Sequence, residues 1–214
     1  MSLKPLRHMW VGGLRSVVGG AQHPTHVSVF FHGLSEIGDD ASFYFSKLID
    51  RHPSNLFLFP TSPDEAEHGG GDWFRFKGKD VLDVIRDRVC HINSWLDDLL
   101  LEHGLSNKDV CLGGFSQGAG LAAYTGLPRG VDQIILTGGI VNPRPQMLPR
   151  DSTSRILAVN GKQDHLVELD YLQHLLSPFQ TRFHVLPGVG HQVTEQHIDL
   201  IDNFLKLPPD NVSK

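Results

Sequence analysis

The sequence lacks the features that would assign the protein to a membrane, a nucleic acid or a disulfide-bonded scaffold. None of its apolar stretches approaches the roughly 18–20 residues that a membrane-spanning helix requires. The net charge is −5, so there is no excess of basic residues for binding nucleic acid. Only two cysteines, Cys90 and Cys111, occur in 214 residues. This count argues against a disulfide framework and favours a reducing, cytoplasmic location.

Signals for secretion and for metal binding are also missing. The N-terminal segment carries early positive charge, but Arg15 interrupts its only apolar run, so we expect no secretory signal. The thirteen histidines are scattered, without an HExxH motif or a Cys/His cluster at the spacing of a zinc site. We therefore expect neither a metal ion nor another cofactor.

What the sequence does contain is an alternation of short apolar runs and helical patterns. The runs typical of buried strands are Val27–Phe31, Leu56–Phe59, Val110–Leu112, Ile134–Thr137, Ile156–Val159 and Phe183–Leu186, and Leu14–Val18 indicates a further strand at the sheet edge. The clearest helix is expected from Asp80 to His103, with Gly104 as its stop. Shorter helices are expected at Ala41–Ile49, Gly118–Gly126, Leu169–Leu176 and Gln192–Leu205.

This alternation predicts an α/β fold. Strands that are apolar along their whole length are covered on both faces, as in a mostly parallel sheet flanked by helices. There is no internal repeat and no linker long enough to separate domains. We expect residues 1–214 to form a single domain with a core from about residue 8 to residue 207, and the tail LPPDNVSK (207–214) to be frayed.

The segment GFSQG (114–118) is a candidate nucleophile motif. By itself a GxSxG match can arise by chance, but here an apolar strand precedes it and a helix of small residues follows. A strand-to-helix elbow holds its central residue in a strained conformation, and the flanking glycines let neighbouring backbone approach. Ser116 is therefore predicted to be a nucleophile, with a glycine-rich turn as the alternative.

A serine hydroxyl needs a base and the base needs an acid that orients it. His191 follows the last predicted strand, between glycine and the final helix, where an imidazole can reach over the sheet edge. Asp164 lies in the loop after Ile156–Val159, which gives the chain order Ser, Asp, His. Glu168 and Asp170 are nearby alternatives, but both are expected inside the next helix.

An oxyanion intermediate would need two N–H donors. The amide of Gln117 lies at the start of the helix after Ser116, where the helix dipole favours negative charge. The second donor is expected from the loop after the first core strand, where Gly33 permits a turn that directs the amide of Leu34 toward the pocket.

Six segments together carry a family resemblance. They are HGLSEIGDD (32–40), FPTSP (59–63), DWF (72–74), GGFSQGAGLA (113–122), NGKQDHLV (160–167) and GVGH (188–191). In this order, and over about residues 26 to 205, they resemble the phospholipase/carboxylesterase family of α/β-hydrolases, which includes acyl-protein thioesterases. The resemblance implies an α/β-hydrolase fold without a large cap domain. It also implies a serine esterase that uses Ser116, Asp164 and His191, with the amides of Leu34 and Gln117 as oxyanion hole.

The chain departs from the family pattern near the expected acyl site. Family members usually have HGLGD where this chain has HGLSE, so Ser35 and Glu36 are expected to alter the loop. The stretch DEAEHGGG (64–71) lies where thioesterase relatives form part of the acyl-binding groove, which argues against a preference for long lipid chains. Trp73 and Phe74 are candidate walls of the acyl site, with core packing as the alternative.

The function favoured by the sequence is that of a carboxylesterase with a small-molecule ester or thioester substrate. Lysophospholipase and acyl-protein thioesterase activities are alternatives within the same class, and lactone or peptide hydrolysis on the same machinery stays open. A non-catalytic binding protein that retains the hydrolase pocket is the alternative from another class. A long apolar groove near Ser116 would indicate lipid acyl chains, and a shallow one would indicate small esters.

Overall fold

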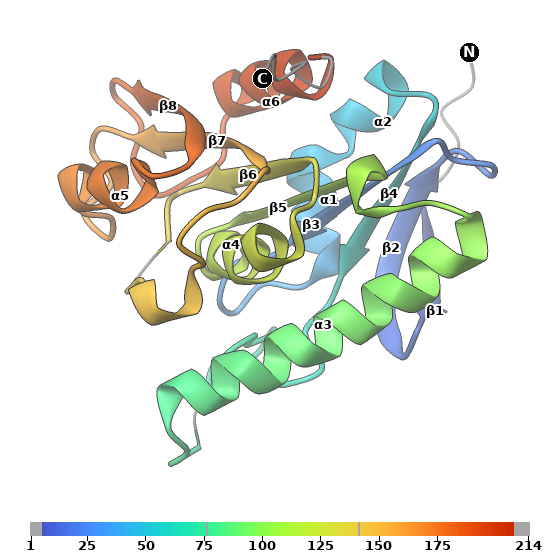
Figure 1. The fold of residues 1–214 in the computed structure, drawn as a ribbon, viewed down its shortest axis with the longest axis horizontal. Helices are drawn as coiled ribbons and strands as arrows, with labels where there is room; N and C mark the ends of the chain where they lie inside the picture. Colours follow the sequence, from blue (N-terminus) through green and yellow to red (C-terminus); the bar gives the residue numbers. More distant parts are fainter. Residues whose placement is uncertain (1–5, 76, 141, 208–214) are drawn as a thin grey trace.

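A single sheet of eight strands forms the centre of the molecule (Figure 1). The structure is a computed structural model that describes residues 6–75, 77–140 and 142–207. The strand order is β1-β2-β4-β3-β5-β6-β7-β8. The β1–β2 and β2–β4 pairs are antiparallel, and every later pair is parallel. The prediction of an α/β fold with a mostly parallel sheet is confirmed.

The elements follow one another in the alternating order expected. The strands are β1 (Arg7–Val11), β2 (Leu14–Gly20), β3 (His26–Phe31), β4 (Asn55–Pro60), β5 (Val110–Phe115), β6 (Gln133–Thr137), β7 (Arg155–Gly161) and β8 (Gln180–Leu186). The helices are α1 (Gly38–Phe45), α2 (Lys47–Arg51), α3 (Val81–His103), α4 (Gln117–Arg129), α5 (Leu169–Leu176) and α6 (Glu195–Leu205).

The N-terminal edge of the sheet differs from the prediction. Leu14–Val18 belongs to β2, but β2 is not the edge strand, because Arg7–Val11 pairs with it from outside as β1. Gly12 and Gly13 are the two residues of the turn between β1 and β2, with φ of 51° and 84°. β1 escaped prediction because its apolar run, Met9–Val11, is short and follows the polar Arg7 and His8, and because its side chains are mostly exposed.

The helices begin and end close to where the sequence predicted. The Asp80 side chain accepts hydrogen bonds from the amides of Leu82 and Asp83 at the start of α3, and Gly104 ends that helix with φ of 66°. The prediction of a continuous helix over Ala41–Ile49 is wrong, because Ser46 ends α1 and begins α2.

Helices cover both faces of the sheet and produce two apolar layers. On one face, apolar residues of α3, α4 and α5 pack against alternate residues of the strands, for example Leu112 of β5. On the other face, α1, α2 and α6 pack against the intervening positions, including Cys111. The central strands are therefore apolar along their length, and their carboxyl ends present loops at one edge where a site can form.

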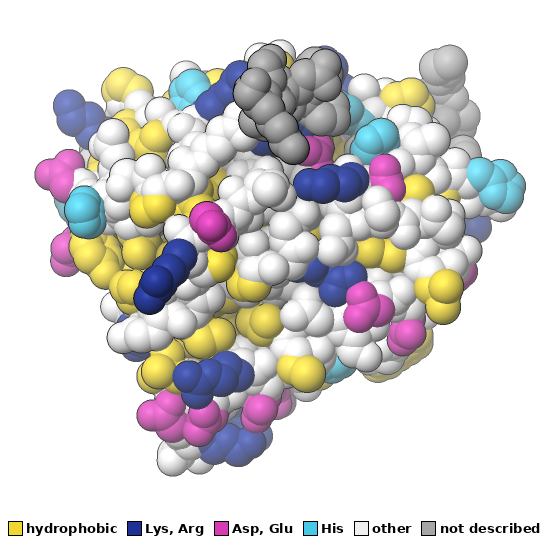
Figure 2. All heavy atoms as spheres, viewed as in Figure 1, with side chains coloured by type: hydrophobic (Ala, Val, Ile, Leu, Met, Phe, Trp, Pro, Cys, Tyr) yellow, Lys and Arg dark blue, Asp and Glu magenta, His cyan; other side chains and the backbone are white. Residues whose placement is uncertain are grey.

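The surface charge and the character of the helices relate to the expectations that the protein has no basic face for nucleic acid and no membrane-spanning helix. On the face drawn in Figure 2, basic and acidic side chains are interspersed without a field of one sign. Within the described ranges, no helix has both the length and the apolar character needed to cross a bilayer. The predicted fraying concerns residues 207–214, of which all but Leu207 lie outside the described residues.

Candidate active site

Ser116 stands at a sharp turn between β5 and α4. Its φ of 54° and ψ of −114° lie in a region that non-glycine residues rarely adopt. The neighbouring glycines are required by close backbone contacts: a Cβ on Gly114 would lie 2.4 Å from the carbonyl carbon of Gly118, and one on Gly118 would lie 2.2 Å from the carbonyl oxygen of Phe31. The segment therefore has the geometry of a strand-to-helix elbow that projects its serine from the sheet.

Three side chains predicted to act together are connected by hydrogen bonds. His191 Nε2 lies 2.9 Å from Ser116 Oγ, and His191 Nδ1 lies 2.7 Å from Asp164 Oδ2. Because a carboxylate only accepts, the Nδ1 atom must carry the proton, which leaves Nε2 free to accept from the serine hydroxyl. The Asp164 side chain is fully buried, and its other oxygen accepts from the amide of Leu166. This arrangement can transfer a proton from serine to imidazole.

Close packing of two loops brings the acid and the base together. A Cβ on Gly161 would lie 2.2 Å from the carbonyl oxygen of Val189, so the loop after β7 passes directly against the loop that carries His191. The amide of Gln163 also donates to the Val189 carbonyl at 2.8 Å. The alternatives Glu168 and Asp170 are exposed at the start of α5. Of the three acids considered, Asp164 is the one the structure brings to His191.

The two amides predicted to bind an oxyanion lie beside the same cavity. Leu34 and Gln117 both line it together with Ser116. In the described part of the chain, neither amide nitrogen donates to another group. The side chain of Glu36 stabilises the loop around Leu34. Its Oε2 accepts a hydrogen bond from the amide of Gly33 at 2.7 Å, and its Oε1 accepts one from the Tyr44 hydroxyl at 2.9 Å. Burial, followed by this bond to Glu36, raises the pKa of Tyr44 to about 12.

His32 is a structural part of the site that the sequence did not single out. Its Nδ1 donates to the carbonyl of Gly33 at 2.7 Å, and its Nε2 accepts from the amide of Ser62 at 3.0 Å. The ring is fully buried, and burial lowers its pKa to about 4 although the bond to Gly33 opposes the shift. A neutral His32 therefore fixes the start of the Leu34 loop to the segment after β4.

The side chain of Gln117 connects the elbow to the DWF segment. Its Oε1 accepts from the amide of Trp73 at 2.9 Å, and its Nε2 donates to Asp72 at 2.7 Å. The Arg88 guanidinium of α3 donates to the Trp73 carbonyl at 3.0 Å. This network was also missed, because it depends on which side chains the fold brings together rather than on local spacing. One residue thus supplies both a candidate oxyanion donor and a fixed contact to the pocket wall.

Trp73 and Phe74 have different places. Trp73 is fully buried, lies edge-on to Phe31 and donates from its indole to the carbonyl of His32 at 3.1 Å. Trp73 is absent from the lining of the cavity beside Ser116, whereas Phe74 lines it. The core-packing alternative therefore describes Trp73, because its ring is fully buried against Phe31 and His32. Phe74 has the position that its predicted role as a wall requires.

The acidic, glycine-rich stretch 64–71 packs against the Leu34 loop instead of the cavity. The amide of Ser35 donates to the Gly71 carbonyl at 2.9 Å, and the amide of Gly71 donates to the Glu36 carbonyl at 2.7 Å. A Cβ on Gly70 would lie 2.1 Å from the Ser35 carbonyl oxygen. No residue of this stretch lines the cavity. Its glycines therefore allow a close approach that supports the loop, and the stretch forms no part of the cavity wall, although the corresponding region of thioesterase relatives was expected to contribute to their acyl-binding groove.

A cavity of about 420 Å³ opens beside Ser116. This size is within the range of small-molecule sites. The residues that line it are Gly33, Leu34, Glu36, Phe74, Val81, Ile85, Phe115, Ser116, Gln117, Gly120, Tyr124, Ile140, Asn142, Arg144, Leu166 and His191. We call the part bounded by Phe74, Val81, Ile85, Tyr124 and Ile140 the apolar arm. Its surface suits the hydrocarbon portion of a substrate.

Helix α4 leaves room for the apolar arm at Gly120. A Cβ on Gly120 would lie 3.5 Å from Ile140 Cγ2, 3.6 Å from Tyr124 Cε2 and 3.9 Å from Phe74 Cε2. These are ordinary contact distances, so the glycine is not required by a clash but leaves space between the three side chains. As for ions, no group of three or more acidic, histidine or cysteine side chains in the described ranges is placed to hold a metal.

Comparison with known proteins decides the family. The model of the phospholipase/carboxylesterase family matches residues 13–208. The chain belongs to the phospholipase/carboxylesterase family. This family membership, inferred above from six motif segments, is confirmed, as is the α/β-hydrolase fold that the resemblance implied.

Individual relatives of the family agree with this result. The chain is 25% identical over 217 residues to acyl-protein thioesterase 1 of Kluyveromyces lactis, which covers 88% of this chain and 94% of that protein. It is 25% identical to acyl-protein thioesterase 1 of Debaryomyces hansenii, over 83% and 90% of the two chains. The crystal structure of esterase PE8 superposes with a TM-score of 0.78 at 25% identity, over 90% and 97%.

A more distant structure supports the fold alone. The Bacillus cereus carboxylesterase superposes with a TM-score of 0.74 at 19% identity, covering 89% of this chain and 92% of that one. Family and relatives together make this protein a hydrolase of the carboxylesterase and acyl-protein thioesterase group.

Proposed function

We propose that the protein hydrolyses carboxylic esters through an acyl intermediate on Ser116, with His191 as general base and acid and Asp164 as the group that orients it. The observation that carries this proposal is the chain of hydrogen bonds from Asp164 through His191 to Ser116, at 2.7 Å and 2.9 Å, beside an apolar cavity. The strained elbow at Ser116 supports it independently, because such a conformation is retained where it serves a function.

In the first half of the reaction Ser116 attacks the ester carbonyl while His191 Nε2 takes its proton. The carbonyl oxygen becomes an oxyanion and accepts hydrogen bonds from the amides of Leu34 and Gln117, at the positive end of the α4 dipole. Asp164 stabilises the imidazolium through the bond to Nδ1. The imidazolium then protonates the leaving alcohol, and the C–O bond to the alcohol breaks.

In the second half water takes the place of the alcohol. His191 removes a proton from the water as it attacks the acyl carbonyl, and the same two amides stabilise the second oxyanion. Collapse of this intermediate returns the proton to Ser116 Oγ and releases the carboxylic acid. Apart from the ester and a water molecule, the proposed cycle uses only groups of this chain.

The apolar arm indicates the acyl part of the substrate. It belongs to the cavity that Ser116 lines, and its walls are aromatic and branched side chains, among them Val81 and Ile85 of α3 and Tyr124 of α4. Each methylene removed from water there contributes about 0.8 kcal/mol to binding. We therefore propose unbranched acyl chains of intermediate length, longer than acetyl and shorter than palmitoyl, as the preferred class.

The test is Ser116→Ala in a p-nitrophenyl ester assay over acyl lengths from acetyl to palmitoyl. We expect wild type to show a maximum at intermediate length, and the variant to lose at least about 10⁴-fold in kcat/KM at every length. A fluorophosphonate probe should label wild type and not the variant. Circular dichroism and thermal unfolding of the variant should match wild type. Retained turnover in a folded Ser116→Ala variant would refute the assignment.

Two further activities are competing candidates. The relatives named acyl-protein thioesterase favour hydrolysis of S-acyl thioesters on the same machinery, and the family name favours lysophospholipids. A thioester and an oxygen ester with the same acyl chain, compared at matched concentrations, distinguish the first, and release of fatty acid from lysophosphatidylcholine tests the second. A binding protein that retains the pocket would fail to react with the fluorophosphonate probe.

The proposal extends to location and organisation. We place the protein in the cytoplasm, which is supported by two unpaired cysteines, Cys90 on the surface and Cys111 in the core. We also treat residues 1–214 as one α/β-hydrolase domain, supported by a single sheet to which β1 and β8 both belong.

A further inference from the structure

β1 is an edge strand, and some of its backbone N–H and C=O groups point away from the sheet. In the described part of the chain, β2 is its one strand neighbour. The two residues of the connecting turn both have positive φ, as in a type I′ turn, which makes Val11 and Leu14 a hydrogen-bonded pair. Alternation along the strand then directs the N–H and C=O groups of Val11, Met9 and Arg7 to β2. Those of His8 and Trp10 point to the open side.

Exposed apolar side chains gather at this edge. Met9 is 47% exposed and Trp10 is 73% exposed, although both are large apolar residues in a strand. Phe43 of α1 is 80% exposed and lies one turn beyond Asp39, whose carboxylate bonds to the ring of His8. Isolated apolar residues on a surface are common, whereas a cluster of them marks an interaction site.

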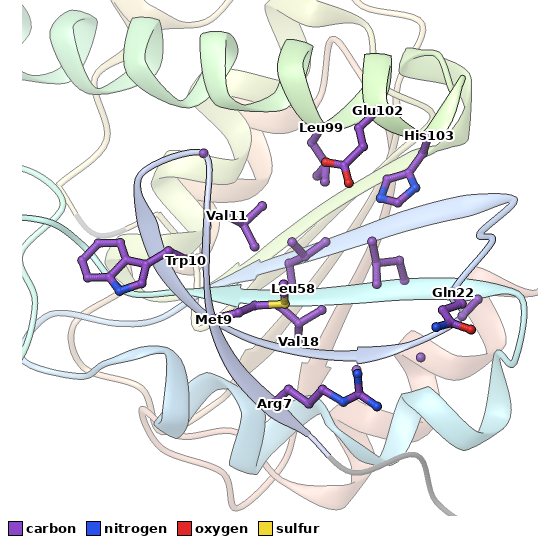
Figure 3. Close-up of a pocket in the computed structure, with 15 residues that line it drawn as sticks. Arg7, Met9, Trp10, Val11, Val18, Gln22, Leu58, Leu99, Glu102 and His103 are labelled. Atoms are coloured by element: carbon purple, nitrogen blue, oxygen red, sulfur yellow. The ribbon is translucent and has the colours of Figure 1, made fainter.

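The two faces of β1 have different surroundings. Figure 3 shows Met9 reaching over Val18 and Leu58 into a groove, while Trp10 points away from its centre. The groove has a volume of about 490 Å³ and lies between the sheet edge and the last turns of α3. A strand added outside β1 would therefore find Met9 and the groove on one face, and on the other the exposed Trp10, which also borders the groove.

We propose that β1 pairs antiparallel with β1 of a second copy of this chain, about a twofold axis that passes through Met9. In this register His8 stands opposite the second copy's Trp10, and Trp10 stands opposite its His8. The open N–H and C=O groups of these residues then all pair across the axis. Met9 meets Met9 over the groove, and the two sheets become one.

The strand is self-complementary in this register. On one face each indole lies against an imidazole, and on the other Arg7 lies opposite Val11 with the two methionines between them, so no like charges stand directly opposite each other. Such an isologous contact closes after two copies. If β1 of one copy paired with β8 of another, the pair would still have one unpaired β1 and one unpaired β8. Further copies could then add at both ends and form longer assemblies.

The pairing leaves the cavity beside Ser116 open. β1 is separated from β5, which carries Ser116 at its end, by β2, β4 and β3. No residue of β1 lines that cavity. The dimer and the hydrolase activity are therefore independent proposals, and either can fail alone.

Sedimentation velocity of the full chain over a concentration series tests the association. We expect a monomer–dimer equilibrium without larger species. Met9→Lys places two ammonium groups opposite each other and Trp10→Pro removes an open-edge donor where proline is tolerated, so each should raise the dissociation constant by about tenfold or more. Leu101→Lys, at an 83% exposed position on α3, is the matched control and should change nothing.

Cross-linking tests the register itself. In a Cys90→Ser background, oxidation of a Met9→Cys variant should give a covalent dimer, because the side chains on the axis are within reach of a disulfide. Arg7→Cys should not cross-link, because Arg7 stands opposite Val11. Circular dichroism and ester hydrolysis report whether each variant is folded. A monomer at all concentrations, assemblies larger than two, a dimer indifferent to Met9→Lys and Trp10→Pro, or equal cross-linking at both positions would each overturn the proposal.

Discussion

Filling the apolar arm at Gly120 should shorten the acyl chains that the enzyme accepts. Gly120→Val adds three carbon atoms in the space between Phe74, Tyr124 and Ile140, where a first added carbon already meets neighbours at 3.5–3.9 Å. The variant side chain therefore occupies volume that the end of an acyl chain would use. Gly120→Ala adds one carbon at ordinary contact distances and is the matched control.

The size of the effect follows from the number of methylenes displaced. If valine excludes two or three of them, the loss is about 1.6–2.4 kcal/mol at 0.8 kcal/mol each. At 1.36 kcal/mol per tenfold this is roughly a 15- to 60-fold fall in kcat/KM for the chain length that wild type prefers. Acetyl ester hydrolysis should stay within about twofold of wild type, because the short chain does not extend to Gly120. Gly120→Ala should leave the profile nearly unchanged and stabilise α4 by up to about 1 kcal/mol.

The assay is initial-rate hydrolysis of p-nitrophenyl esters from acetyl to palmitoyl by wild type, Gly120→Ala and Gly120→Val, with urea unfolding of all three proteins. The reasoning predicts a change in the ratio of long-chain to short-chain rates, not in the rate alone. If Gly120→Val slows all chain lengths equally while unfolding normally, the acyl chain does not lie in the apolar arm.

Three further changes test Glu36 and Ser35 in the Leu34 loop and the buried His197 of α6. Glu36→Ala removes the acceptor for the Gly33 amide and should lower kcat roughly tenfold for all esters, while Glu36→Gln keeps the acceptor and the rate; equal rates in both variants would contradict this. Burial lowers the pKa of His197 to about 4 in the folded protein, whereas its ordinary value of 6.5 applies in the unfolded chain. As pH falls from 6.5 toward 4 the unfolded chain therefore binds a proton that the folded protein does not, and the free energy of unfolding decreases by about 3 kcal/mol at the acid end. His197→Gln can keep the bond to the Thr194 amide, and its urea stability should depend less on pH in that window; an unchanged slope would refute it. Ser35→Gly should raise the free energy of unfolding by about 0.5–1 kcal/mol, because Ser35 has φ of 65°, and a loss would show that its side chain is needed.

The parts of the fold that sequence predicted well are those where burial leaves a local pattern. Val27–Phe31 of β3 and the whole of β5 are buried because helices cover both faces, and their mainly apolar residues make that burial visible in the sequence. α3 was visible for the same reason, since its buried side recurs at helical spacing. β1 has no fully buried side chain and is held by pairing with β2, so its short apolar run, Met9–Val11, carried no pattern of burial that distinguished it from a loop.

The candidate site also contains residues that the sequence could identify and residues that it could not. Ser116, Asp164 and His191 could be proposed because each follows a strand at a position that the topology fixes. The side-chain roles of His32 and Gln117 could not, because their partners are 30 and 44 residues away in the chain and are brought there by tertiary packing. Burial of Trp73 was undecided for the same reason, since an aromatic residue in a loop can equally wall a pocket or fill a core.

The backbone conformation of Ser116 has a consequence for how such a protein changes over generations. A serine at φ of 54° costs about 1–2 kcal/mol that a glycine there would not. A lineage released from the need for acyl transfer could recover that free energy with one substitution, and the packing of Gly114 and Gly118 would already accommodate it. On the proposed role of Ser116, loss of activity at this position is therefore a step toward greater stability, and selection for hydrolysis is what would hold the serine in place.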